Sequence, residues 1–215
     1  MSYQMAYDLL SATGETLYMV FLSTLFAVLL GLPLGILLYS STRIKPNPKL
    51  CKTLSALINI FRSIPFIILL VAIIPFTRFI VGTSIGINAA IVPLTVGATP
   101  FFARLIDNVF QALPPGLIET GYAMGASTRQ IILYIILPEA KSGLIHAITV
   151  TAITLVNYSA MAGAVGAGGL GTLAINYGYQ RFNAGVMIST VIVLIILVQL
   201  IQTAGDYLAK RCTHH

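Results

Sequence analysis

The sequence predicts an all-α integral membrane protein with five membrane-spanning helices, and three observations support this fold class. Of the 215 residues, 57% are hydrophobic, and the mean hydropathy is +0.93. Only 8% are charged, whereas soluble domains carry about 25% charged residues. The apolar residues form long segments of about the 20 residues that cross a bilayer. Lipid offers the backbone no hydrogen-bond partner, so each such segment must be a helix.

Five segments are long and apolar enough to cross a membrane, and they make residues 1–215 a single transmembrane domain. We expect the spans at about 17–39, 57–80, 87–106, 143–162 and 185–208. Gly31-x-Pro33-x-Gly35 in the first span predicts a small-residue surface for helix packing. The second and third spans contain the prolines Pro65, Pro75, Pro93 and Pro100. Because proline removes a helical hydrogen bond, we expect both of these helices to be bent.

Lysine and arginine residues predict the orientation of the chain. Nine of them lie in the first loop, the central loop region and the tail: Arg43, Lys45, Lys49, Lys52, Arg104, Arg129, Lys141, Lys210 and Arg211. An outside N-terminus and a cytoplasmic C-terminus place all nine in the cytoplasm, as the positive-inside rule requires, and leave Arg78 and Arg181 outside. Arg62 lies inside the second span, where a charge costs about 2.5–3.5 kcal/mol. We expect it to reach the cytoplasmic interface or to pair within the bundle.

Charged and sulfur-containing residues argue against several classes of function. The net charge of +6 comes from span ends rather than from a basic run with interleaved aromatics, so nucleic-acid binding is not expected. Cys51 and Cys212 are isolated and predict neither a metal site nor a disulfide. No Asp or Glu lies in the interior of an expected span, since Asp107 and Asp206 sit at span ends, and this argues against a proton- or ion-coupled carrier. The sequence has no Walker motif, so we do not expect this chain to be an enzyme that hydrolyses ATP.

A polar, patterned segment at 114–138 separates the third and fourth spans. Pro114-Pro115 is suited to open a first short helix, because proline is favourable in a first turn. Ile118, Tyr122 and Ala126 recur at a spacing of four residues and give this helix an apolar face. The segment therefore begins with a short amphipathic helix.

A second helix follows a break at Gly125. Ser127 and Gln130 have the spacing of a capping box, which marks a helix start. Its apolar side is formed by Ile131, Ile132, Ile135 and Ile136, and Pro138 is expected to end it just before the fourth span. The segment is thus a helix-turn-helix on the cytoplasmic face. It could lie on the lipid surface or present a helix to a groove of a partner protein; its single basic residue, Arg129, argues against DNA.

The same segment resembles the "EAA" signature of the permeases of binding-protein-dependent ABC importers. That signature reads EAA, three residues, G, nine residues, I, one residue, LP. This sequence has the signature residue at every fixed position except the two alanines: Glu119, Gly125, Ile135, Leu137 and Pro138. Thr120 and Gly121 replace the two alanines. The resemblance implies a type I importer permease in which this helix docks into a separate ATPase subunit. The residues expected to couple to the ATPase are Glu119, Tyr122, Ala123, Met124, Gly125, Ala126, Ile135, Leu137 and Pro138.

Four further stretches resemble the methionine-importing branch of this family. They are residues 59–70, 75–78, 81–86 and 158–171. This resemblance implies a homodimer of five-helix subunits in the bacterial cytoplasmic membrane, two ATP-binding cassette subunits below it, and a methionine-binding lipoprotein outside. ATP and magnesium would be bound by the ATPase and no cofactor or metal by this chain.

The outer end of the fourth span carries the glycine motif Gly166-x-Gly168-x-x-Gly171. It matches a dinucleotide-binding pattern, but that pattern needs a preceding strand, which a membrane span excludes. Either the motif is a flexible turn, or it forms an outer gate where backbones of two subunits approach closely. Met161 either plugs the path or packs in the core. We name Asn157, Tyr158, Met161, Gly163 and Gly166 as the candidate gate or path.

These observations predict a permease subunit that moves methionine by alternating access, driven by a separate ATPase. Three alternatives remain open. The chain could import another amino acid, it could be an ATP-independent carrier or channel, or it could be a membrane scaffold that transports nothing.

Overall fold

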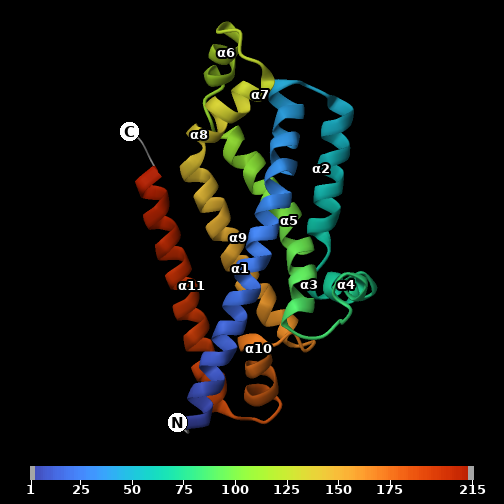
Figure 1. The fold of residues 1–215 in the computed structure, drawn as a ribbon, viewed down its shortest axis with the longest axis vertical. Coiled ribbons are helices and arrows are strands. Elements are labelled where there is room, and N and C mark those ends of the chain that lie inside the picture. The colour runs from blue at the N-terminus through green and yellow to red at the C-terminus, as the bar shows by residue number, and fades with distance from the viewer. Residues whose placement is uncertain (1–2, 213–215) are drawn as a thin grey trace.

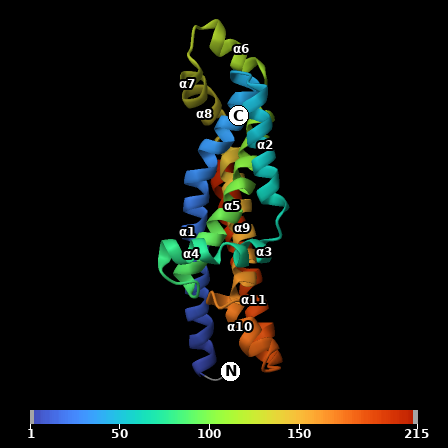
Figure 2. The same cartoon turned by 90° about the vertical axis from the view of Figure 1, so that its right-hand side faces the viewer.

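The computed structural model describes residues 3–212, and this part of the chain is built from helices with no strand. The long helices run lengthwise in an elongated bundle (Figure 1). The two ends of the chain lie toward opposite ends of the bundle's long axis. The view in Figure 2 shows how narrow the bundle is in the perpendicular direction. A chain whose ends lie at opposite ends of a bundle crosses it an odd number of times.

The first helix, α1, runs from Tyr3 to Tyr39 and continues as the π-helix η1 (Ser40–Ile44). It is much longer than the expected span 17–39, because helix formation continues past the apolar stretch into the more polar N-terminal residues. The helix α5 (Ile87–Gln111) packs along it. A Cβ atom on Gly31 would lie 2.9 Å from the carbonyl oxygen of Thr99. The small-residue packing surface expected on α1 is therefore confirmed.

The second expected span, 57–80, is not one helix. It is divided among α2 (Pro48–Ser63), α3 (Phe66–Ala72) and α4 (Ile74–Val81), and α2 and α3 meet at 97°. Ile64 is extended, as the residue before a proline prefers to be, and Pro65 has no N–H group to continue the helix. The bend expected at Pro65 is therefore a complete break.

The remaining long helices are continuous. The helix α5 passes through Pro93 and Pro100 without a break, α9 runs from Lys141 to Gly163, and α11 runs from Ala184 to Cys212. Within residues 3–212, four helices are long and apolar enough to cross a membrane, and the bent pair of α2 and α3 would make a fifth crossing. The expected total of five spans is reached only when the broken segment is counted.

Three carboxylates lie in the long helices, at or beyond the ends of the expected spans. Glu15 is inside α1, Asp107 is inside α5 and Asp206 is inside α11, because these helices extend beyond the apolar segments. Asp107 is 1% exposed and accepts hydrogen bonds from Arg104 (3.2 Å) and from Gln111 (2.9 Å). The buried charge is thus balanced by a neighbouring guanidinium.

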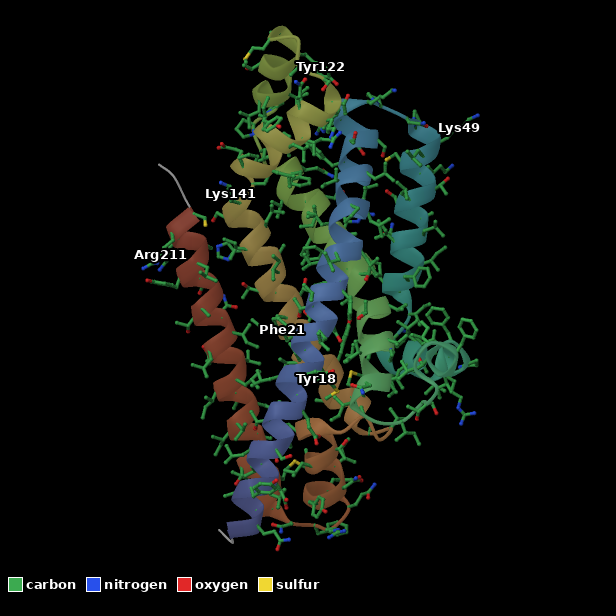
Figure 3. All side chains as sticks on the ribbon, in the orientation of Figure 1. Tyr18, Phe21, Lys49, Tyr122, Lys141 and Arg211 are labelled. Atoms are coloured by element: carbon green, nitrogen blue, oxygen red, sulfur yellow. The ribbon has the colours of Figure 1, made fainter. Side chains whose placement is uncertain are left out.

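Short helices cap both ends of the bundle. At one end lie α6 (Gly116–Ala123), α7 (Thr128–Gln130), η2 (Ile131–Ile136) and α8 (Leu137–Glu139). At the other end lie α10 (Gly169–Leu173) and η3 (Ala174–Tyr179). Figure 3 shows Lys49, Lys141 and Arg211 in the half of the bundle that carries α6.

Candidate functional site

The segment between α5 and α9 forms the tip of the molecule at the α6 end (Figure 1). The helix α6 begins at Gly116, directly after the proline pair, as expected. It ends at a turn in which Gly125 has φ +76°, a left-handed conformation that glycine adopts at little cost. The amide of Ala126 donates a hydrogen bond to the carbonyl of Gly121 across this turn, at 3.0 Å. The predicted break at Gly125 is confirmed.

The capping box predicted at the start of the second helix is present. The side chain of Ser127 accepts a hydrogen bond from the amide of Gln130. The side chain of Gln130 accepts one from the amide of Ser127, at 2.8 Å. This pair fixes where the chain turns back toward the bundle.

Isoleucines hold the tip on the bundle. Ile118 from α6 and Ile131 and Ile136 from η2 are buried in one cluster with Tyr39 and Phe110 from the ends of α1 and α5. This cluster joins the tip to two long helices, so displacement of α6 has to disturb the ends of α1 and α5.

Packing explains why position 121 is a glycine, where the family signature has an alanine. A Cβ atom at this position would lie 2.9 Å from Cγ1 of Ile131 and 3.0 Å from Cδ1 of Ile135. An alanine would fit only if these side chains moved. The bulky isoleucines of η2 and the glycine of α6 therefore complement each other.

The predicted coupling residues divide into exposed and anchoring groups. Met124 is 78% exposed and Tyr122 is 46% exposed. The exposed members are Glu119, Tyr122, Ala123, Met124, Gly125 and Pro138, and the partly buried members are Ala126, Ile135 and Leu137. An exposed face that includes a large apolar side chain such as Met124 is typical of a binding surface.

The second helix ends next to Pro138, close to the predicted position. The π-helix η2 continues directly into α8, which ends at Glu139, and Ala140 separates it from α9.

The glycine motif at the C-terminal end of α9 makes a close turn within one chain. Gly166 and Gly168 have φ +85° and +92°, and α10 follows directly. A Cβ atom on Gly171 would lie 2.5 Å from the carbonyl oxygen of Ala160, and one on Gly163 would lie 2.7 Å from Cα of Gly171. The backbones of α9 and α10 of one chain therefore approach each other closely, and the expected approach between two subunits stays a prediction.

Two polar residues of α1 that the sequence analysis did not single out hold this glycine turn. Glu15 accepts a hydrogen bond from the amide of Gly169 at 2.7 Å, and Thr16 accepts one from the amide of Leu170 at 2.9 Å.

The helix α10, by contrast, was not expected at all. Its residues are mostly Gly, Leu and Thr, and a segment of five residues has no usable periodicity.

The other candidate path residues lie along α9. Tyr158 is partly buried, and its ring stacks on that of Phe66 with centroids 4.3 Å apart. Asn157 is exposed, and Met161 is 41% exposed rather than packed in the core. An apolar cavity of about 230 Å³ lies beside the gate segment, with Ala162 and Val165 in its wall. Thus the structure brings Met161, Gly163 and Gly166 together at one end of α9, and places Tyr158 deeper.

Comparison with protein families gives one match over most of the chain. Residues 31–214 match the family described as "Binding-protein-dependent transport system inner membrane component". A D-methionine transport system permease protein, MetI, from Escherichia coli K12 is 57% identical over 165 residues, covering 76% of each chain. A probable D-methionine transport system permease from Vibrio cholerae is 50% identical over 208 residues, covering 96% of this chain and 92% of the relative.

Solved structures include two with the same overall fold. A chain from the MetNI methionine ABC transporter in inward-facing conformations has a TM-score of 0.98 at 56% identity, and all of both chains is covered. An amino acid ABC transporter crystallised with histidines has a TM-score of 0.79 at 22% identity, covering 96% of this chain and 94% of the other. The second likeness concerns the fold alone.

Proposed function

This chain belongs to the binding-protein-dependent transport system inner membrane components, and we propose that it is the permease subunit of an ATP-driven importer for methionine. The observation that carries this proposal is the match to the MetNI methionine transporter, at 56% identity and a TM-score of 0.98 over the whole chain. Side chains at half of all positions are shared with methionine permeases along nearly the full length. A substrate class can be inferred more safely from a relative at 56% sequence identity than from a shared fold alone.

The partners follow from this role. A second copy of the chain completes the path, because five crossings are few to enclose a solute route and closed two-fold dimers are the commonest assembly. Two ATP-binding cassette subunits bind ATP and magnesium and carry out hydrolysis. A methionine-binding protein delivers the solute from outside. The chain itself supplies a gated route and mechanical coupling, and it is not an enzyme.

The coupling surface is the exposed face of α6. Glu119, Ala123 and Met124 offer a carboxylate, a small side chain and a large apolar side chain to a cleft of the ATPase. The turn at Gly125 sets the direction of this face, and the isoleucine cluster connects it to α1 and α5. When the two ATPase subunits close on ATP, they draw the two α6 helices together, and the ends of the long helices follow.

Alternating access then moves the solute. The conformation resembles the inward-facing relative, so the outer turn at Gly163–Gly171 corresponds to the closed side. Closure of the ATPases opens this outer turn to the binding protein, and hydrolysis returns the bundle to the inward-facing state. The chain lies in the cytoplasmic membrane with its N-terminus outside and its C-terminus and α6 inside.

Uptake of labelled L-methionine tests the function. A strain without this permease gene should lose high-affinity uptake and recover it when the chain is restored, with competition only by methionine stereoisomers and close analogues. Equal competition by unrelated amino acids would withdraw methionine as the cargo. Uptake that survives deletion of the ATPase would favour an ATP-independent carrier instead.

A further inference from the structure

Arg62, in the last turn of α2, is an exposed arginine within the span region. It makes no ion pair and no hydrogen bond with any residue between 3 and 212. Arg104, by contrast, pairs with Asp107 at 3.2 Å and donates to Asn59 at 3.1 Å. The pairing expected for Arg62 within the bundle is therefore not found among these residues. An ionisable side chain held in a membrane without a partner indicates a functional site.

The depth of Arg62 separates it from the lipid headgroups. It lies near the end of α2, roughly 20 Å along the helix axis from Lys49 at the other end. Its neighbours across the cavity described below are Gly97 and Phe101, near the midpoint of the 25-residue α5. Because the hydrocarbon core is about 30 Å thick, this position lies well inside it.

Arg62 lines a small, mainly polar cavity at the break between α2 and α3. The cavity has a volume of about 110 Å³, enough for several water molecules or for the charged end of an amino acid. Tyr158 also lines it, and the hydroxyl of Tyr158 has no hydrogen-bond partner within residues 3–212. The rings of Phe61, Phe66 and Phe101 form much of the remaining wall. Two unpartnered polar groups thus line a site whose remaining wall is apolar, with Ile64, Leu69 and Gly97 beside the three phenylalanines.

From this geometry we infer that the cavity binds the transported amino acid, with the guanidinium of Arg62 holding its α-carboxylate. This inference rests on the proposed function and assigns a solute site to the permease itself. A guanidinium binds a carboxylate through two parallel hydrogen bonds. The aromatic wall suits a thioether side chain, since sulfur makes favourable contacts with ring edges. No acidic residue lines the cavity, so it selects the carboxylate end of the zwitterion.

The test is equilibrium binding of labelled L-methionine to the assembled permease–ATPase complex in nanodiscs of zwitterionic lipid, without the binding protein. Arg62→Gln should weaken the permease component of binding by about 10- to 100-fold, the effect of losing a charged hydrogen bond. The affinity of Arg62→Lys for methionine should lie between those of wild type and Arg62→Gln, because lysine keeps the charge but cannot make the two parallel hydrogen bonds. Arg78→Gln, on the exposed α4, is the matched control and should bind like wild type. Any methionine site on the ATPase contributes equally to all variants.

Competition by L-methioninol distinguishes a binding role from a structural one. This analogue replaces the carboxylate by an alcohol, so wild type should prefer methionine and Arg62→Gln should lose that preference. Unchanged affinity in Arg62→Gln, or an equal loss for both compounds, would overturn the inference. The uptake of labelled L-methionine by cells that carry the wild-type chain tests the proposed function separately from this binding site.

Discussion

The hydroxyl of Tyr122 donates a hydrogen bond of 2.6 Å to the carbonyl oxygen of Ile44. This contact joins the last turn of α6 to the last residue of η1, which continues the 37-residue helix α1. Figure 3 shows Tyr122 at this end of the bundle. The bond gives α6 a polar connection to α1 in addition to the isoleucine cluster, so a force on α6 reaches a helix that extends to the opposite end.

Replacing Tyr122 by phenylalanine should weaken this connection and keep the ring. One lost hydrogen bond is worth about 1 kcal/mol, so we expect methionine uptake to fall about two- to fivefold while ATP hydrolysis continues. Tyr134→Phe is the matched control, since Tyr134 lies in η2, is 75% exposed and has no hydrogen-bond partner among residues 3–212. Equal uptake by the two variants would remove Tyr122 from the coupling pathway.

Gly125 allows a charge test of the proposed ATPase contact. A Cβ atom at this position meets nothing within 4 Å, so only its φ of +76° and its surroundings in the complex restrict substitution. Asparagine and aspartate both tolerate this conformation. We expect Gly125→Asp to insert normally and to abolish uptake, whereas Gly125→Asn should retain much of it. Normal uptake in the aspartate variant would contradict docking at this turn.

A substitution at Gly171 tests whether the turn between α9 and α10 depends on the close approach of their backbones. A Cβ atom there would lie 2.5 Å from the carbonyl oxygen of Ala160, and backbone cannot rotate away as a side chain can. Gly171→Ala should therefore cost about 1–3 kcal/mol and lower the Tm of the purified complex. Gly14→Ala, in α1 with nothing within 4 Å, should not lower the Tm. A Gly171→Ala complex as stable as wild type would show that the turn can relax.

Glu15 should control how firmly the outer turn is held. Its carboxylate accepts the amide of Gly169 at 2.7 Å, so Glu15→Ala leaves that amide without its partner. We expect hydrogen exchange of residues 168–173 to accelerate about tenfold, which corresponds to a loss of about 1.4 kcal/mol in local stability. Glu15→Gln keeps an acceptor oxygen and should exchange close to the wild-type rate. If Glu15→Ala left exchange unchanged, the anchoring role would be refuted.

The sequence predicted the fold wherever a pattern was long and local. Apolar length identified four of the crossings, and the capping box at Ser127 and the break at Gly125 are confirmed. It did not predict that Pro65 would break a span by 97°, because proline chemistry predicts a lost hydrogen bond and not the angle. The helix α1 is longer than the expected span 17–39, because hydropathy measures the apolar stretch and not where the helix ends.

The site was predictable only in part, for a similar reason. The exposed face of α6 follows from spacing along one helix. The anchor at Glu15 depends on a hydrogen bond to Gly169, far away in sequence, and no local signal points to it. The cavity at Arg62 also needs α2, α5 and α9 to be placed together, although the unusual charge inside a span was visible in the sequence.

The most direct test of the central claim is transport by the purified complex in proteoliposomes, with ATP on the α6 side and the methionine-binding protein on the other. The account predicts that labelled L-methionine moves toward the ATP side only when ATP is hydrolysed, and that Gly125→Asp stops this movement. Methionine flux that needs no ATP, or hydrolysis that never moves methionine in the wild-type complex, would contradict it.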